Sequence, residues 1–291
     1  MTLILTLVTR SASANKIASN APGGLGAARE RAGKSWSVTE RSISPNHCAE
    51  LVEYLSAETG AAQADWAITP EENRRKRLLI SDMDSTIIGQ ECLDELAGFA
   101  GLKEKVSAIT ERAMRGELDF ASALTERVAM LKGLGLDALE ACYRERVTLN
   151  PGAKELVATM KAHGARCVLV SGGFRFFTSR VAKASGFDTD RANMLVDDGK
   201  ALTGAVGEPI LGREAKLAAL KEEAAAIGAT PADAIAMGDG ANDLDMIREA
   251  GLGVAYKAKP IVAAETLARI EHTDLTAALF FQGYAETDIV S

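Results

Sequence analysis

Two aspartates separated by one residue stand directly after a short apolar run, Leu78-Leu79-Ile80. The run is typical of a buried strand, and the residues after Ser81 are Asp82-Met83-Asp84-Ser85-Thr86. If the extended geometry continues, Asp82 and Asp84 point the same way, because strand side chains alternate between faces. Two like charges this close need a cation, a proton or a polar partner. Taken alone, the pentapeptide also fits a strand-to-helix turn capped by Asp and Ser.

Two later apolar runs end in polar residues in the same way. The run 166–170 leads into Ser171-Gly172-Gly173, and the run 234–237 leads into Gly238-Asp239-Gly240-Ala241-Asn242-Asp243. Helical periodicity between the runs predicts an α/β core with a mostly parallel sheet and helices on both faces. Such sheets bind ligands beyond the carboxyl ends of their strands. Three polar strand ends therefore indicate a site more strongly than any one of them.

A helical insertion interrupts this pattern at residues 90–148. Asp119 and Asp137 occupy positions expected for helix N-caps. Arg127 falls within an apolar stripe, where a guanidinium needs an anionic partner or a route to water. On the residues alone, a structurally paired arginine is the favoured interpretation. The expected helices are 91–100, 102–115, 120–132 and 138–147.

Residues 1–76 are expected to form a small N-terminal α/β module. Gly33-Lys34-Ser35 suggests a nucleotide-binding loop, but the glycine required five residues before Gly33 is Ala28, so such a site is not expected. The polar stretch 70–77 reads as a linker. The expected elements are strands at 2–9, 35–39 and 64–69 and a helix at 48–59. The expected domains are 1–76, a catalytic core of 77–89 and 149–291, and a cap at 90–148.

Composition argues against several classes of protein. The net charge of −7 is unsuited to a general nucleic-acid binder. The cysteines form no CxxC pair and the histidines no HExxH, so neither zinc nor disulfides are expected, and scattered thiols suit the cytoplasm. No apolar run approaches the ~20 residues that span a bilayer, so no membrane partner is expected. Residues 1–10 read as a strand and not as a signal peptide. A homodimer is left open.

The polar strand ends favour chemistry on a phosphate. Carboxylates and small polar groups without His or Cys suit a hard cation such as Mg²⁺, which is often shared with a phosphate. Ser171, Lys216 and Asn242 offer contacts to the phosphate oxygens. A carboxylate nucleophile would form an acyl-phosphate, and the second carboxylate would act as general acid and then base.

Four motifs, in this order, resemble those of the haloacid dehalogenase-like (HAD) phosphohydrolases. They are Asp82-x-Asp84-x-Thr86, Ser171, Lys216 and Gly238-Asp239-Gly240-x-Asn242-Asp243. The resemblance covers residues 78–256 and implies a Rossmann-like HAD core closed by the helical cap. Within the family, the runs Gln90-Glu91-Cys92-Leu93-Asp94-Glu95-Leu96-Ala97 and Ser171-Gly172-Gly173-Phe174 resemble the members that act on O-phosphoserine.

That resemblance implies a Mg²⁺-dependent enzyme that hydrolyses O-phosphoserine to serine and phosphate, the last step of serine biosynthesis. It implies Asp82 as nucleophile, Asp84 as acid and base, and Mg²⁺ on the carboxylates of Asp82 and Asp239 and the carbonyl of Asp84. The implied phosphate contacts are Ser171, Gly172, Lys216 and Asn242, with Asp243 in support. The implied substrate contacts are Glu91 to the ammonium, Arg127 to the carboxylate, and Met114 and Phe120 as a lid.

Two alternatives stay open. One is the same chemistry on another small phosphorylated metabolite, or phosphoryl transfer to an acceptor. The other is a phosphoserine sensor on an inactive phosphatase fold, although every implied catalytic position carries a competent residue. Residues 1–76 are only vaguely similar to ACT-like regulatory domains, and their role is left open.

Overall fold

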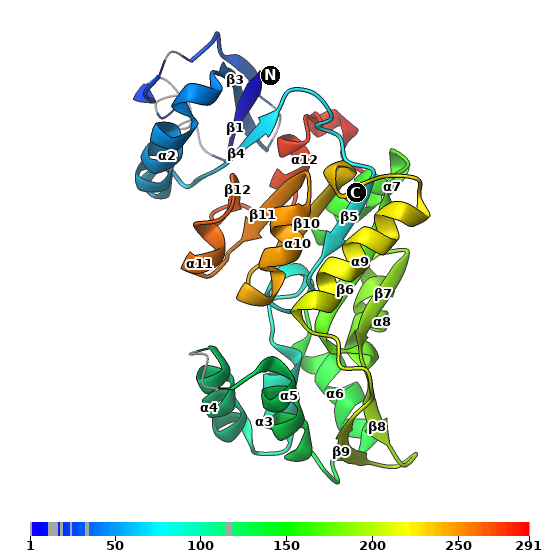
Figure 1. Cartoon of the computed structure of the whole chain (residues 1–291). Coiled ribbons are helices and arrows are strands. Elements are labelled where there is room, and N and C mark those ends of the chain that lie inside the picture. The colour runs from blue at the N-terminus through cyan, green and yellow to red at the C-terminus, as the bar shows by residue number, and fades with distance from the viewer. Residues whose placement is uncertain are drawn as a thin grey trace.

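Strands and helices alternate after residue 77 to build the central sheet of the molecule. The computed structural model describes residues 2–10, 17, 20–23, 25–32, 35–114 and 118–290. Ten strands of this described chain form one sheet in the order β2-β3-β1-β4-β12-β11-β10-β5-β6-β7 (Figure 1). Its parallel part consists of β5 (Leu78–Ser81), β6 (Arg166–Phe174), β7 (Thr189–Asn193), β10 (Ala234–Gly238), β11 (Leu252–Tyr256) and β12 (Ala268–Ile270). The predicted α/β class with a mostly parallel sheet is confirmed.

Helices cover both faces of this sheet, and β5 shows why its sequence is an unbroken apolar run. Leu78 and Ile80 pack beneath α9 and α10, whereas Leu79 packs on the other face with α7, α8 and α12. Each fully buried Leu or Ile contributes roughly 1.5–3 kcal/mol. The helices are α7 (Ala153–Ala162), α8 (Arg175–Ser185), α9 (Arg213–Ala226), α10 (Leu244–Glu249), α11 (Pro260–Ala263) and α12 (Ala277–Phe281).

The cap lies at one end of the sheet, at the bottom of Figure 1. Its helices lie where the periodicity predicts them: α3 (Cys92–Phe99), α4 (Lys103–Met114), α5 (Phe120–Ala129) and α6 (Leu136–Arg146). A hairpin of β8 (Leu195–Asp197) and β9 (Leu202–Val206) extends the cap, because Gly133 N–H donates to the Leu202 carbonyl at 2.8 Å. Asp119 caps α5 as predicted, by accepting from Ser122 N–H. The N-cap prediction for Asp137 is wrong, because α6 begins at Leu136 after Gly135 and places Asp137 inside the first turn.

The cap is joined to the core by two adjacent chain segments. Gly89 N–H donates to the Thr148 carbonyl at 3.3 Å, and Asn150 N–H donates to the Ile87 carbonyl at 2.8 Å. The side chains of Gln90 and Thr148 also exchange a hydrogen bond at 2.9 Å. These bonds fix where the chain leaves and re-enters the core.

The N-terminal strands extend the core sheet. Their elements are β1 (Leu3–Thr9), β2 (Arg29–Ala32), β3 (Ser37–Ile43), α2 (Cys48–Ala62) and β4 (Ala64–Pro70). Strand β4 pairs antiparallel with β12 of the core, which makes the sheet continuous. The sequence pattern did not predict β2, and the suggested Gly33-Lys34 loop lies outside the described residues. No helix of the described chain is both long and apolar enough to cross a bilayer.

Candidate active site

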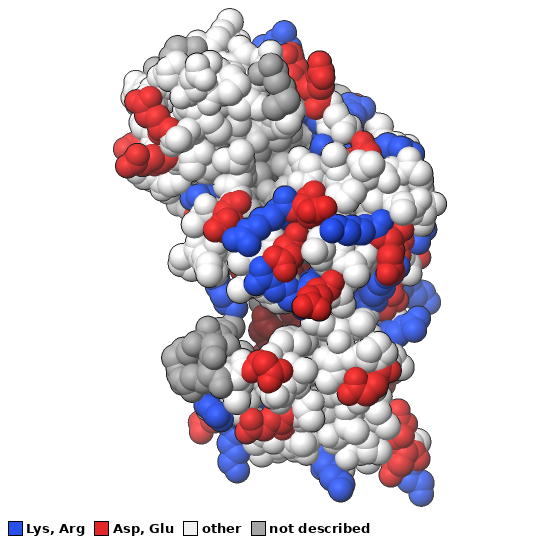
Figure 2. Space-filling model, viewed as in Figure 1, with Lys and Arg blue, Asp and Glu red and all other residues white. Residues whose placement is uncertain are grey.

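A pocket of about 380 Å³ lies between the carboxyl ends of the parallel strands and the cap. Figure 2 shows this hollow between the core and the cap, with acidic side chains at its base. Two further predicted site residues lie next to Asp82: Lys216 contacts Asp82, and Asp243 contacts Lys216. The side chain of Met114, also a predicted site residue, lies outside the described part of the structure. The predicted residues that line the pocket are Asp82, Asp84, Glu91, Phe120, Arg127, Ser171, Gly172, Asp239 and Asn242.

The turn after β5 aims both first-motif aspartates into the pocket. Asp82 and Asp84 have extended backbones, with φ/ψ of −63°/159° and −64°/137°. Met83 between them lies within a helical turn and is fully buried in the core, whereas both aspartates line the pocket. The extended geometry of the strand therefore does not continue through the motif. Ser85 then takes a left-handed φ of 55°, and its hydroxyl donates to Glu91 Oε1 at 2.7 Å.

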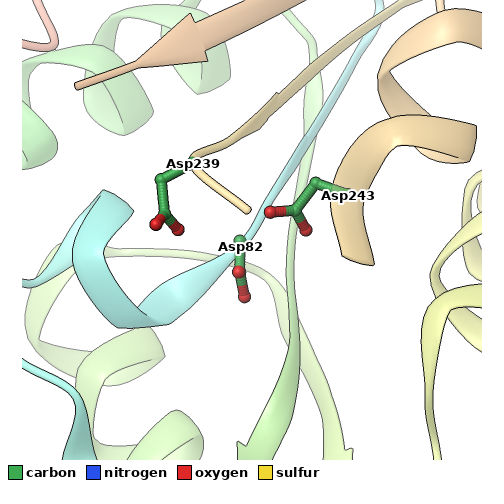
Figure 3. Close-up of side chains that lie close together, drawn as sticks. All are labelled: Asp82, Asp239 and Asp243. Carbon is green, nitrogen blue, oxygen red and sulfur yellow. The ribbon is translucent and has the colours of Figure 1, made fainter. Parts of the chain in front are cut away.

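Three buried carboxylates gather around the end of β5. Oxygens of Asp82, Asp239 and Asp243 all lie within 4.8 Å of one another (Figure 3). Lys216 Nζ lies 2.8 Å from Asp82 Oδ1 and 2.6 Å from Asp243 Oδ1. Asp243 Oδ2 accepts from Gly240 N–H at 3.1 Å, so both oxygens of Asp243 have protein partners. This leaves Asp82 and Asp239 as the carboxylates best able to take a ligand.

The electrostatics of the cluster call for a cation. Burial, followed by repulsion from Asp243, raises the pKa of Asp82 well above its ordinary value. Burial, then Asp243 and Glu91, raises the pKa of Asp239 to about 7. Burial alone disfavours a charged Lys216, but attraction by Asp243 and Asp82 raises its pKa above the ordinary value. Crowded carboxylate oxygens without His or Cys fit a hard divalent ion such as Mg²⁺.

Asp84 is held by two hydrogen bonds on the other side of the pocket. Its Oδ1 accepts from Cys92 N–H at 3.0 Å, and its Oδ2 accepts from the Ser171 hydroxyl at 3.3 Å. Burial, followed by repulsion from Glu91, raises the pKa of Asp84 to about 7. A carboxyl group with this pKa can both give and take a proton near neutral pH.

Strand β6 forms the pocket wall that lies directly against Asp84. The strand continues beyond the apolar run 166–170, because pairing with β7 resumes across a register shift and reaches Phe174. A Cβ on Gly173 would lie 2.8 Å from Asp84 Oδ2, and one on Gly172 would lie 2.9 Å from the Phe120 ring. Only glycine allows so close an approach of backbone, carboxylate and cap.

The cap contributes Glu91 and Arg127 to the pocket. Arg127 Nε donates to the Ala123 carbonyl, and Nη1 donates to the Thr110 hydroxyl, both at 3.1 Å. Among the described side chains, no carboxylate forms an ion pair with Arg127. Burial lowers the pKa of Arg127, and attraction by Asp94 opposes that effect. The guanidinium is therefore ordered, while some of its N–H groups have no acceptor among the residues that the structure describes.

The profile of the family described as haloacid dehalogenase-like hydrolase matches residues 79–248. The chain belongs to the haloacid dehalogenase-like hydrolase family. A phosphoserine phosphatase from Polaromonas sp. is 48% identical over 204 residues, which cover 68% of this chain and 86% of that relative. A phosphoserine phosphatase from Streptococcus thermophilus is 49% identical over 201 residues, which cover 69% and 93%.

One solved structure extends the family likeness to nearly the whole chain. A HAD family hydrolase from Salmonella enterica serovar Typhi has a TM-score of 0.87 at 30% identity and covers 96% of this chain and 98% of its own. A phospho-aspartyl intermediate analogue of phosphoserine phosphatase has a TM-score of 0.66 at 39% identity and covers 71% and 99%. The first structure thus covers almost all of this HAD hydrolase and the second a smaller part of it.

Sequence reasoning missed several residues of this HAD hydrolase's pocket. Thr110 and Lys259 line it, and Lys259 N–H donates to the Asp239 carbonyl at 3.0 Å. Asn193 supports it from behind, because its buried amide donates to the Gly172 carbonyl at 2.8 Å. None of these residues belongs to a motif.

Proposed function

We propose that the chain hydrolyses O-phosphoserine to serine and inorganic phosphate. The observation that carries the proposal is that Asp82 and Asp84 share one pocket with Glu91 and Arg127. The first pair suits attack on a phosphate monoester, and the second offers charges opposite to the ammonium and carboxylate of an amino acid. Relatives named phosphoserine phosphatase, 48% and 49% identical, support this substrate.

Asp82 is the proposed nucleophile, and its surroundings select one of its oxygens. Oδ1 accepts from Met83 N–H at 2.8 Å and lies 2.8 Å from Lys216 Nζ, whereas Oδ2 has no hydrogen-bond partner among the described residues. In the first step Oδ2 attacks phosphorus and the bond from phosphorus to the serine oxygen breaks. The product on the enzyme is an aspartyl-phosphate.

Asp84 is the proposed proton carrier in both steps. Protonated, it gives its proton to the departing serine oxygen. Ionised, it takes a proton from a water molecule as that water attacks the aspartyl-phosphate, which releases phosphate and restores Asp82. The hydrogen bonds from Cys92 N–H and the Ser171 hydroxyl hold the carboxyl group in one position for both steps.

The phosphoryl group requires positive charge and hydrogen-bond donors in the pocket. Lys216, the Ser171 hydroxyl, the Asn242 amide and the backbone of Gly172 are the proposed contacts. Mg²⁺ on the carboxylates of Asp82 and Asp239 and the carbonyl of Asp84 would screen the charge between nucleophile and phosphate. We place the reaction in the cytoplasm, where the four free thiols of the chain would stay reduced.

The Asp82→Asn variant tests the proposal. It keeps the size of the side chain but removes the nucleophile, so phosphate release should fall on the order of 10⁴-fold or more. The assay uses O-phosphoserine, phosphorylated sugars and O-phosphothreonine, with Mg²⁺ or EDTA. Asp198→Asn, a change at an exposed carboxylate in the β8–β9 hairpin, is the control and should keep full activity. Near-normal turnover by Asp82→Asn, or a preference for a phosphorylated sugar, would contradict the proposal.

A further inference from the structure

We infer that Thr110 of α4 is a positioning residue that orients Arg127 toward the carboxylate of the substrate. The inference rests on the proposed function, because it concerns recognition of the amino-acid part of O-phosphoserine. Thr110 belongs to none of the family motifs, and it lines the same pocket as Arg127.

The hydrogen bonds of Arg127 show how the guanidinium is aimed. Nε donates to the Ala123 carbonyl of its own helix, and Nη1 donates across to the Thr110 hydroxyl. These two bonds fix both the plane of the guanidinium and its rotation. Among the described residues, one hydrogen on Nη1 and both on Nη2 have no acceptor, and these are the donors that a carboxylate binds in a bidentate manner.

The Thr110 hydroxyl is itself held in one orientation. It donates to the Val106 carbonyl one turn earlier, at 3.2 Å, so its lone pairs are left to accept from Arg127. Thr110 and Val106 belong to α4, whereas Arg127 belongs to α5. The bond therefore links two cap helices at the pocket wall.

The environment of Arg127 makes this orientation necessary. Leu124 and Leu131, on the same face of its segment, are buried, and no carboxylate of the described side chains pairs with the guanidinium. Ordering a free arginine on binding costs side-chain entropy, and a residue that orders it beforehand removes that cost. Thr110 should thus strengthen binding of a carboxylate-bearing substrate without changing the chemistry at phosphorus.

The experiment compares Thr110→Val with Thr110→Ser on two substrates. Valine keeps the shape and removes the hydroxyl, so KM for O-phosphoserine should rise about 10-fold, as for loss of a hydrogen bond to a charged group, while kcat changes little. Serine should restore KM. O-phosphoethanolamine carries the phosphate and the ammonium but no carboxylate, so its kcat/KM should not respond to either change.

A matched control and a second background separate positioning from folding. Thr59 in α2 makes the same kind of bond, to the Leu55 carbonyl at 2.6 Å, and Thr59→Val should leave both substrates unaffected. In an Arg127→Ala background, Thr110→Val should raise KM no further, because Thr110 acts through Arg127.

The outcomes distinguish this inference from the proposed function. No hydrolysis of O-phosphoserine by the unaltered protein overturns the proposed function, and the inference with it. An active protein whose Thr110→Val variant keeps its KM, or loses kcat/KM equally on both substrates, overturns the inference alone. A raised KM for O-phosphoserine only, reversed by Thr110→Ser, supports it.

Discussion

The buried amide of Asn193 joins two segments of the pocket wall that no sequence motif connects. Its Nδ2 donates to the carbonyls of Gly172 and Leu211 at 2.8 and 3.1 Å, and its Oδ1 accepts from Leu211 N–H at 2.6 Å. Leu211 lies just before α9, the helix that carries Lys216. One side chain therefore sets the spacing between two proposed phosphate contacts.

Replacing Asn193 with Leu keeps the volume of the side chain and removes all three bonds. The free energy of unfolding should fall by about 1–3 kcal/mol for each buried group left unpaired. The kcat/KM values for O-phosphoserine and O-phosphoethanolamine should fall by the same factor, since the change acts on the phosphate end of the pocket. Urea denaturation and steady-state kinetics measure the two effects.

Gln282→Leu is the matched control for Asn193→Leu. Gln282 is also a buried amide with both ends paired, to Lys76 N–H at 3.0 Å and to the Ala278 carbonyl at 3.1 Å, but it lies away from the pocket. This variant should lose stability and keep kcat/KM. Equal kinetic loss in both variants would show that Asn193 matters only for folding.

For single residues, the sequence predicts the charged residues of the pocket better than the neutral polar residues that position them. Asp82 and Asp84 stand out because two carboxylates after a buried strand are costly without a partner. Asn193 and Thr110 are ordinary polar residues whose importance depends on which carbonyl or guanidinium the fold brings to them. That information is absent from spacing along the chain.

Among the elements, the junction of β4 and β12 shows what periodicity leaves out. Apolar patterning identifies a strand and its buried faces, and it correctly indicated β1, β4 and the core strands β5, β6 and β10. It did not indicate β7 or β12. It also does not say which strand lies beside which, so the continuity of the N-terminal strands with the core sheet was not predicted. The domain boundaries at 1–76, 77–89, 90–148 and 149–291 stay predictions.

Asp65 on β4 fastens this junction. It is 1% exposed, and its carboxylate accepts from the N–H groups of Glu271, His272 and Thr273 at 2.7, 2.9 and 2.8 Å. These residues follow β12, so one carboxylate satisfies the backbone of the turn that leaves the last core strand. Three charged hydrogen bonds in a buried place are strong contacts.

The Asp65→Asn variant should lower the free energy of unfolding by about 2–4 kcal/mol, since a hydrogen bond to a charged group contributes about 1.5–3 kcal/mol and one oxygen is lost. Amide exchange at residues 271–273 should also become faster. Asp198→Asn is the control: its Oδ1 likewise accepts from Lys200 and Ala201 N–H, both at 2.9 Å, but it is exposed to water. A similar loss of stability in both variants would argue against the junction role of Asp65.

For the molecule as a whole, the pocket opposes folding when no cation is present. Asp84 and Asp239 each have a pKa of about 7 in the folded chain, because burial and neighbouring carboxylates disfavour their charged forms. In the unfolded chain the pKa of an aspartate is about 3.9. At a pH between these two pKa values, the folded chain therefore keeps protons on Asp84 and Asp239 that the unfolded chain has released.

It follows that the metal-free protein should lose stability as pH rises from about 4 to about 7 and then level off, since stability falls with pH wherever the folded state binds more protons. Mg²⁺ should reverse this trend and stabilise most above about pH 7, where the carboxylates are ionised. Urea denaturation across this pH range, with EDTA or with excess Mg²⁺, measures both effects.

Asp239→Asn isolates the contribution of the pocket from that of other titrating groups. The variant removes one carboxyl group whose pKa is raised in the folded chain. The difference in the free energy of unfolding between the variant and the unaltered protein should therefore change by a few kcal/mol across this pH range, because a change of one in pKa corresponds to about 1.4 kcal/mol. The variant should also lose most of the stabilisation by Mg²⁺, because Asp239 is a proposed ligand. The two metal-free proteins could instead show the same dependence of stability on pH. That result would mean that Asp239 ionises as readily in the folded chain as in the unfolded chain. Its closeness to Asp82 and Asp243 would then give the folded protein no need of a cation.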